Sequence, residues 1–443
     1  MDPHVGIHQS NNNIAPRIGF AQSLGAHTVL RGGYGISYYP TQSNLSIQLA
    51  NPPVSFLATC IPCIGATLPV PTPPSTAALS GSLTYGASNL NTSTLQMFNL
   101  ALQHEIKGNV VTVAYVGELG RHQMYETTAI NVPRPSGPYP GAATAGPEPT
   151  PAFTTATALP NVGNIESFLP LASSSYHALQ LIFARRLSHG LTFNSNYTYA
   201  HSLTAGFSGS GDTNSGQGLI PTNTSYDYGN SSNDLRSRLA TSITYELPFG
   251  ASAHGLRAFA VKGWSANLID FWQTGLPFSV LDAVTNKYGL AQINLPTVQV
   301  DRPDVTGERL SVTHPTMSQF FNINAFTPQA AGTAGNERLN QLYGPHQRRA
   351  DLSVFKMIAL VREASLQFRA ECYNISNTPN FLPPVSSISG FNPGPEHGSA
   401  NPISLVGVLP GDTPTNAGGF GQIIQTNQIL APRQFQFALK VLF

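Results

Sequence analysis

Apolar and polar residues alternate one by one in segments that recur along almost the whole chain. A side-chain period of two is typical of a β-strand with one apolar and one polar face. The clearest segments are 27–39, 191–200, 238–247, 364–373 and the final run "QFQFALKVLF". One face of that final run holds only large apolar side chains, namely Phe435, Phe437, Leu439, Val441 and Phe443. The alternation therefore predicts an all-β chain built from two-faced strands.

Two-faced strands fit either a β-sandwich, which buries the apolar face, or a transmembrane β-barrel, which turns it toward lipid. Charged residues make up only 10% of the chain, against roughly 25% in ordinary globular domains. The mean hydropathy is −0.06, and no stretch approaches the roughly 18 consecutive apolar residues of a spanning helix. Alternating strands average to neutral hydropathy, so this composition favours the barrel and excludes a helical membrane protein.

The connections between the segments are alternately short and long. Short connections such as "KGN" and "LSHG" contain Gly108 and Gly190, which supply the positive φ that tight hairpins require. Long polar stretches separate the pairs, at 40–93, 119–175, 202–235, 275–347 and 377–431. Short periplasmic turns and long extracellular loops are typical of outer-membrane barrels. We therefore predict an antiparallel transmembrane β-barrel, seen in part as about 11–12 strands.

The predicted strand number has a consequence for the extent of the barrel. We count about eleven strands, whereas a complete bacterial barrel has an even number. The first residues, "MDPHVGIHQSNNNIAPRIGF", lack the basic start and apolar run of a signal peptide. The expectation is that residues 1–443 form the C-terminal portion of a larger barrel.

Several motifs match a known family. "NNNIAPRIGFAQSLGAHTVLRGGYGISYY", "YHALQLIFARRLSHGLTFNSNYTYAHSL", "GWSANLIDFWQTGLPFSV" and "PRQFQFALKVLF" stand in the family's order, with further matches between them. From about Asn11 to Phe443 the chain resembles the Oar-like TonB-dependent outer-membrane receptors. The resemblance implies the C-terminal part of a barrel of about twenty-two strands. Family members also carry a regulatory-like domain and a plug, neither of which we expect within 1–443.

The resemblance also implies a function and a set of partners. It implies an outer-membrane receptor or transporter that binds or takes up a large extracellular ligand in its full-length form. The implied partners are outer-membrane lipid, the outer-membrane assembly machinery, an unknown extracellular ligand, and the TonB system where other sequence supplies a plug. The net charge of +1 gives no reason to expect nucleic acid. The alternative is a cell-surface β-sandwich adhesin or glycan-binding structural protein.

The C-terminal run and several aromatic residues are candidate functional positions. A terminal phenylalanine with apolar residues at alternate positions resembles the signal that the assembly machinery reads, although the same pattern is typical of any lipid-facing strand. Trp264 and Trp272 share one parity and lie roughly 26 Å apart along an extended strand. This spacing predicts anchors at the two edges of the apolar band, and further interface aromatics are expected at Tyr34, Tyr38, Tyr197 and Tyr199.

The polar residues of the loops give little sign of catalysis. His201, Asp227, Ser231 and Asp234 lie close in sequence, but their spacing selects neither a nucleophile nor a base. We interpret them as solvated loop residues and expect no enzyme, no cofactor and no metal site. Cys60 and Cys63 form "CIPC" without a second pair, which favours a local disulfide or free thiols over zinc.

Overall fold

The structure is a computed structural model that describes residues 8–9, 12–39, 83–86, 89–127, 165–205, 224–249, 253–282, 302–328, 335–360, 364–392, 412–415 and 417–443. Cys60 and Cys63, for which we expected a local disulfide or free thiols, lie outside these residues. No helix in the described part of the chain is long and apolar enough to span a membrane.

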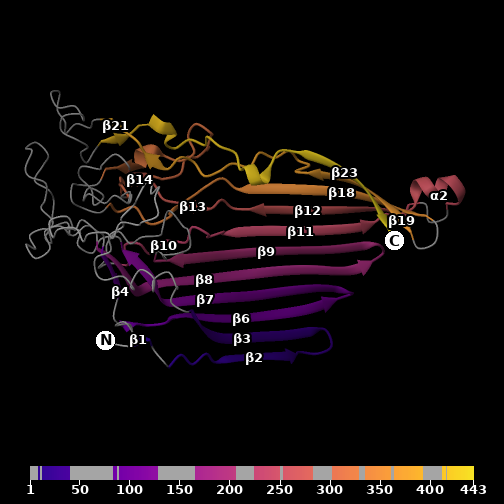
Figure 1. Ribbon diagram of the computed structural model, residues 1–443, viewed down its shortest axis with the longest axis horizontal. Helices are drawn as coiled ribbons and strands as arrows, with labels where there is room; N and C mark the ends of the chain where they lie inside the picture. Colours follow the sequence, from indigo (N-terminus) through magenta and orange to yellow (C-terminus); the bar gives the residue numbers. More distant parts are fainter. Residues whose placement is uncertain are drawn as a thin grey trace, which may run out of the picture.

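Eleven long strands form one sheet in which each strand pairs with the next in chain order (Figure 1). All ten pairings along this path are antiparallel. The strands are β2 (Arg17–Ser23), β3 (Thr28–Tyr39), β6 (Ser93–Ile106), β7 (Asn109–Thr127), β8 (Ile165–Ser188), β9 (Leu191–Thr204), β11 (Ser237–Glu246), β12 (Trp264–Gln273), β18 (Gln347–Ala359), β19 (Ser365–Tyr373) and β23 (Gln434–Leu442). The sheet confirms the predicted antiparallel fold and strand number, and we call it the wall.

The register of the wall separates an apolar face from a polar one. One continuous row across six strands consists of Leu102, Val113, Leu181, Tyr197, Leu239 and Trp272. A neighbouring row on the other face consists of Gln180, Thr198, Arg238, Gln273 and Gln347. Opposite charges also pair on the polar face, as between Arg369 and Glu371 at 3.1 Å. The alternation in the sequence therefore corresponds to two chemically different surfaces.

The apolar face is open. Val113 and Leu181 keep 43% and 40% of their surface exposed. A β-sandwich would cover this face with a second sheet, whereas the long strands here belong to a single sheet. The sandwich alternative is therefore not supported, and the partial barrel fits.

Tight turns join the strands of two hairpins as predicted. Lys107 and Gly108 connect β6 to β7 with φ angles of 49° and 78°. His189 and Gly190 connect β8 to β9 with φ angles of 53° and 77°. Two consecutive residues of positive φ are typical of the type I′ turn, whose twist matches that of the strands. The connection from β11 to β12 differs, because it contains the helix α2 (Gly255–Val261).

Two strands are longer than the sequence pattern predicted. β7 continues to Thr127 and β8 begins at Ile165, so the prediction of a polar connection throughout 119–175 is wrong at both ends. The extension remains paired despite two register shifts, and Tyr125 within it is fully buried beside Ala172. The extension lacks the regular alternation of apolar and polar residues that predicts a strand. Its buried side chains, such as Tyr125 and Ala172, pack against one another instead.

The long stretches after β12 and β19 also contain structure that we did not predict. The short strand pairs there are β13 (Pro277–Phe278) with β17 (Leu342–Tyr343), β14 (Leu281–Asp282) with β20 (Ser387–Ile388), β15 (Asp304–Val305) with β16 (Phe326–Thr327), and β21 (Phe391–Asn392) with β22 (Thr413–Pro414). The 3₁₀ turns are η3 (Ile323–Ala325), η5 (Ala417–Gly419) and η6 (Gln428–Leu430), and the remaining strands are β1 (His8–Gln9), β4 (Leu83–Gly86), β5 (Asn89–Leu90) and β10 (Gly229–Asn230).

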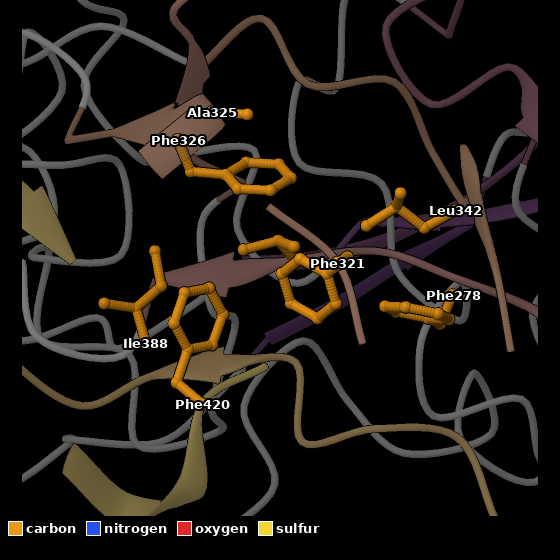
Figure 2. Packing of buried hydrophobic residues seen from close by; sticks show 8 residues of the cluster. Phe278, Phe321, Ala325, Phe326, Leu342, Ile388 and Phe420 are labelled. Atoms are coloured by element: carbon orange, nitrogen blue, oxygen red, sulfur yellow. The ribbon is translucent and has the colours of Figure 1, made fainter. Parts of the chain in front are cut away.

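These short elements enclose an apolar core of their own (Figure 2). Phe321 lies at its centre, with ring centroids 5.8 Å from Phe326 and 5.3 Å from Phe420, both nearly edge-on. Phe278 and Ile388 are buried in the same cluster. We call the described residues of 277–343 and 380–423 the loop platform. It lies at the end of the wall opposite α2 and the C-terminus (Figure 1).

Candidate functional site

A buried ion pair joins the loop platform to the connection between β9 and β11. The Arg302 Nη1 lies 3.1 Å from the Asp227 Oδ1, and these side chains are only 4% and 5% exposed. The Nη2 and Nε groups donate to the carbonyls of Tyr226, at 2.8 Å, and Glu337, at 3.1 Å, respectively. The guanidinium also stacks 4.2 Å from the Tyr226 ring centroid. Arg302 therefore fixes two separate chain segments in one geometry.

Asp227 extends this contact to the wall. Its second carboxylate oxygen accepts a hydrogen bond of 2.7 Å from the hydroxyl of Tyr125 on β7. A buried ion pair holds a geometry well only when its remaining donors and acceptors are also bonded. Asp227 meets this requirement through Arg302 and Tyr125. The platform is thereby fastened to the extended end of β7.

Asp234 forms a second set of buried hydrogen bonds between the platform and the wall; we call each such set a fastening. Its carboxylate accepts hydrogen bonds from the backbone N–H of Ser202, at 2.6 Å, and from the Tyr343 hydroxyl, at 2.5 Å. Arg236 lies 3.0 Å from the same carboxylate and also donates to the Tyr343 hydroxyl at 2.8 Å. Burial, together with the hydrogen bond to Asp234, raises the pKa of Tyr343 to about 12. The hydroxyl therefore remains a donor at neutral pH.

A pair of asparagines forms the third fastening. Asn230 and Asn340 each donate from the side-chain amide to the backbone carbonyl of the other, at 2.8 and 2.9 Å. His201 on β9 lies 2.9 Å from the Asn230 side-chain oxygen. The backbone N–H of Asn340 donates to the Ser279 hydroxyl at 2.7 Å. These bonds align the platform with the end of β9.

Glu337 is the unusual acid of this region. Its Oε1 accepts a 2.9 Å hydrogen bond from the backbone N–H of Val280. Its Oε2 is buried without a hydrogen-bond partner among the described residues. Burial raises the pKa of Glu337 to about 8, although the Val280 N–H and the Arg302 charge oppose this rise. A neutral carboxylic acid is therefore favoured at pH 7.

The structure corrects our interpretation of the polar loop residues. Asp227 and Asp234 are buried rather than solvated, and both hold the platform in place. The Ser231 hydroxyl accepts only a weak 3.4 Å bond from the backbone N–H of Asn233, whereas the Ser231 backbone bonds the Asp234 N–H at 2.8 Å and the Ser202 carbonyl at 2.9 Å. Arg302, Glu337 and Tyr343 were missed, because their partners lie far away in sequence and no local spacing marks them. In the described part of the chain, no group of three His, Cys, Asp or Glu residues could hold a metal ion.

The candidate interface aromatics share the apolar face of the wall. Trp264 and Trp272 lie on one side of β12, opposite Lys356 and Arg348 of β18. The register places four tyrosines on the same face, namely Tyr34, Tyr38, Tyr197 and Tyr199. The structure brings these residues to one surface, and their role as interface anchors stays a prediction.

The C-terminal strand lies at one edge of the wall. Its apolar residues face the same way as the aromatics and pair only with β19, as Phe435 with Cys372, Phe437 with Ala370, Leu439 with Phe368 and Val441 with Leu366. Phe437 is 69% exposed, and Phe443 beyond the strand is 99% exposed. No described residue pairs with the outer edge of β23. Recognition of this strand by the assembly machinery stays a prediction.

Comparison with known proteins places this arrangement in context. No curated protein matches the chain. Among solved structures, the outer membrane transporter YddB from Escherichia coli is matched by 98% of the chain, at 10% identity and a TM-score of 0.43. The siderophore receptor PirA from Pseudomonas aeruginosa is matched by 82% of the chain, at 12% identity and a TM-score of 0.36. The pyoverdine receptor FpvA from Pseudomonas aeruginosa PAO1 is matched by 96%, at 10% identity and a TM-score of 0.40.

The chain spans 41% of YddB, 39% of PirA and 35% of FpvA. A family model described as "Outer membrane beta barrel domain" matches residues 1–436. This match covers every long strand of the wall up to the start of β23. The protein is located in the outer membrane, and the chain belongs to the outer membrane beta barrel domain family.

Proposed function

We propose that this chain is the wall and the ligand-capturing surface of a TonB-dependent receptor of the Oar-like group. In this proposal it is the C-terminal portion of a barrel of about twenty-two strands, which binds or takes up a large extracellular ligand. The observation that carries the proposal is the loop platform, fixed to the wall by the buried pair of Arg302 and Asp227. Loops that only connected strands would not require a core and three fastenings.

The orientation follows from the two kinds of connection. In outer-membrane barrels short turns face the periplasm and long loops face the exterior. The hairpins at Gly108 and Gly190 then lie on the periplasmic side, and the loop platform faces the medium. Binding residues are commonly carried by loops that a rigid scaffold positions. The platform meets this description.

In the proposed mechanism the loop platform binds the ligand and the wall lines the passage. The platform presents a preorganised surface, so that little ordering of the loops opposes ligand binding. The polar face of the wall, with rows such as the one from Gln180 to Gln347, lines a hydrated passage. Coupling to the TonB system requires a plug in that passage, which we propose other sequence supplies.

We propose binding rather than catalysis at the platform. The acids that a hydrolase would need, Asp227 and Asp234, are occupied by Arg302, Tyr343 and backbone groups. Neither acid is bonded to a serine hydroxyl or a histidine among the bonds described above. Their chemistry supports a fixed scaffold.

A binding experiment with a matched pair of variants tests the proposal. The full chain, folded in detergent, is exposed to immobilised ferric siderophores, oligopeptides and oligosaccharides, and the dissociation constant is measured for each. We expect saturable binding to at least one class, weakened at least tenfold in Arg302→Met and unchanged in Arg257→Met at the opposite end. Absence of binding to every class, or equal effects of the two variants, would overturn the proposal.

A further inference from the structure

A buried lysine lies on the apolar face of the wall, where a lysine is unexpected. Lys356 of β18 pairs across the sheet with Trp264 and with Phe368, so all three side chains share that face. Within 351–359, Lys356 interrupts the apolar parity of Leu352, Val354 and Ile358. The side chain is nevertheless only 8% exposed. Some part of the molecule must therefore cover it.

The C-terminal end of α2 covers Lys356. The Lys356 ammonium donates to the carbonyls of Ala260, at 2.9 Å, and Lys262, at 3.1 Å. The indole N–H of Trp264 donates to the same Ala260 carbonyl at 2.9 Å. Since both donors project from the apolar face, the end of α2 must lie over that face. The helix therefore lies beyond the strand ends, on the apolar side of the wall (Figure 1).

The interaction suits the end of a helix. The last carbonyls of a helix lack internal partners and carry partial negative charge, which a cation stabilises. The Lys356 ammonium also lies 4.7 Å from the Trp264 ring centroid and 6.0 Å from that of Phe259. These aromatic faces add a favourable cation–π attraction. Lys356 thus acts as a latch that holds α2 against the wall.

The large exposed side chains of α2 are apolar or cationic. Phe259 is 60% exposed and Val261 is 39% exposed, although both are large apolar residues. The connection 247–263 contains Arg257 and Lys262 and no acidic residue. An exposed apolar surface flanked only by positive charge is typical of helices that lie in the interface of an anionic membrane.

We propose that α2 is a membrane-surface helix that rests on the phospholipids of the periplasmic leaflet. Its position continues the lipid-facing side of the wall, which is the reason for choosing lipid over a protein partner. Phe259 enters the boundary of the acyl chains, while Arg257 and Lys262 meet the phosphate groups. The inference rests on the orientation given in the proposed function but not on ligand binding, which concerns the opposite end.

Spin labels measure the depth of α2 directly. The full chain carries one nitroxide-labelled cysteine, in a background where the native cysteines are replaced, and is reconstituted in phosphatidylethanolamine–phosphatidylglycerol vesicles. Collision with oxygen reports lipid, and collision with a water-soluble nickel chelate reports water. The labelled variants are Phe259→Cys on α2, Lys440→Cys on the polar face of β23, and Met317→Cys on the loop platform.

We expect the label at position 259 to collide severalfold more with oxygen than with nickel, and both controls to show the reverse. Equal nickel access at positions 259 and 440 would overturn the proposal. Replacing phosphatidylglycerol by phosphatidylcholine is expected to make the label at 259 shallower, and an unchanged depth would remove the role of Arg257 and Lys262. The fold of each variant is checked by its heat-modifiable mobility on gels.

A second variant tests whether the hydrogen bonds of Lys356 hold α2 against the wall. Lys356→Met removes the donor to Ala260 and Lys262, so nickel access at position 259 is expected to rise severalfold. Lys440→Met, a lysine at the same end but on the polar face, serves as the control and is expected to change nothing. A label at 259 that stays protected in Lys356→Met would disprove the latch. Ligand binding by the platform, measured separately, is expected to remain intact in either outcome.

Discussion

At the scale of single residues, the buried polar groups of the platform decide how firmly it is held. Each of the three guanidinium nitrogens of Arg302 donates one hydrogen bond, whereas the Glu337 carboxyl has one bonded oxygen and one without a partner among the described residues. A carboxylate in such a position is destabilised by lost hydration, and the protonated form is favoured instead. The platform therefore contains a buried ion pair and, beside it, an acid whose neutral form is favoured by burial.

The pH dependence of platform stability follows from Glu337. Its pKa is raised from 4.5 to about 8, so the folded platform binds one more proton than the unfolded chain between these values. The contribution of the Glu337 proton to the free energy of unfolding is then fully present below about pH 4.5 and is lost as the pH rises through about 8. This loss amounts to a few kcal/mol at most. We expect amide hydrogen exchange in 335–343, corrected for intrinsic rates, to show protection falling from pH 5 to pH 9.

Glu337→Gln provides the control for this experiment. The amide keeps the acceptor for the Val280 N–H but has no proton to lose. Protection in the variant is expected to be nearly independent of pH. A pH dependence equal to that of the parent chain would assign the effect to another group.

At the scale of elements, the wall depends on its hairpins and on its last strand. The turns at Gly108 and Gly190 have nearly the same φ, but their surroundings differ. An added Cβ at Gly108 would meet nothing within 4 Å, whereas one at Gly190 would lie 2.7 Å from the Glu246 backbone oxygen. The second hairpin is therefore also a contact between β9 and β11.

Alanine at the two glycines is expected to have unequal effects. Gly108→Ala should destabilise the folded state by about 1–2 kcal/mol, the strain of a left-handed residue. Gly190→Ala adds a backbone clash, and the Glu246 N–H that bonds the Gly190 carbonyl at 2.8 Å would shift with it. Urea unfolding in detergent measures both variants. If both variants lost the same free energy of unfolding, β11 would be able to shift away from the added Cβ at no cost in free energy.

The last residue allows assembly to be separated from stability. Phe443 is almost fully exposed beyond β23, so Phe443→Ala is expected to change the free energy of unfolding by less than about 0.5 kcal/mol. If the assembly machinery reads this ring, heat-modifiable protein should accumulate severalfold more slowly in cells, with an unchanged folding rate in detergent. Gln436→Ala, on the opposite face of β23, is the control. If Phe443→Ala slowed accumulation in cells and folding in detergent equally, Phe443 would act only through its contacts within the wall.

The elements also show what a sequence can predict here. Most of the wall was predictable because its strands alternate outside the extended ends of β7 and β8, and Gly108 and Gly190 mark two of its turns. The platform was not, because Phe278, Phe321 and Phe420 are far apart and follow no period. The short helix α2 was not predicted either, because its 7 residues are too few to show a helical period. Lys356, which interrupts the parity of Leu352, Val354 and Ile358, contacts the end of this helix.

At the scale of the whole molecule, two parts are stabilised in different ways. The wall is a ladder of backbone hydrogen bonds whose apolar face needs lipid or detergent. The platform has a core of its own around Phe321 and is joined to the wall by Arg302, Asp234 and Asn340. Units with separate cores need not unfold together.

Unfolding in detergent is therefore expected to occur in two steps. The platform should lose protease resistance first, while the wall keeps its heat-modifiable mobility on gels. Arg302→Met leaves Asp227 buried without its cation, a change that typically destabilises by about 3–5 kcal/mol. We expect this variant to lower the first transition and leave the second unchanged. Arg309→Met, an exposed arginine of the platform, is the control, and a single shared transition would contradict the division.

The ten antiparallel steps of the wall leave β2 and β23 pointing in the same direction. Two copies of this chain related by rotation about the membrane normal would therefore meet with like-directed edges, forming two parallel seams. An antiparallel seam between copies would require one of them to be inverted, with its loop platform on the wrong side of the bilayer. The strands from β2 to β23 therefore cannot form a homodimeric ring in which every pair of neighbouring strands is antiparallel.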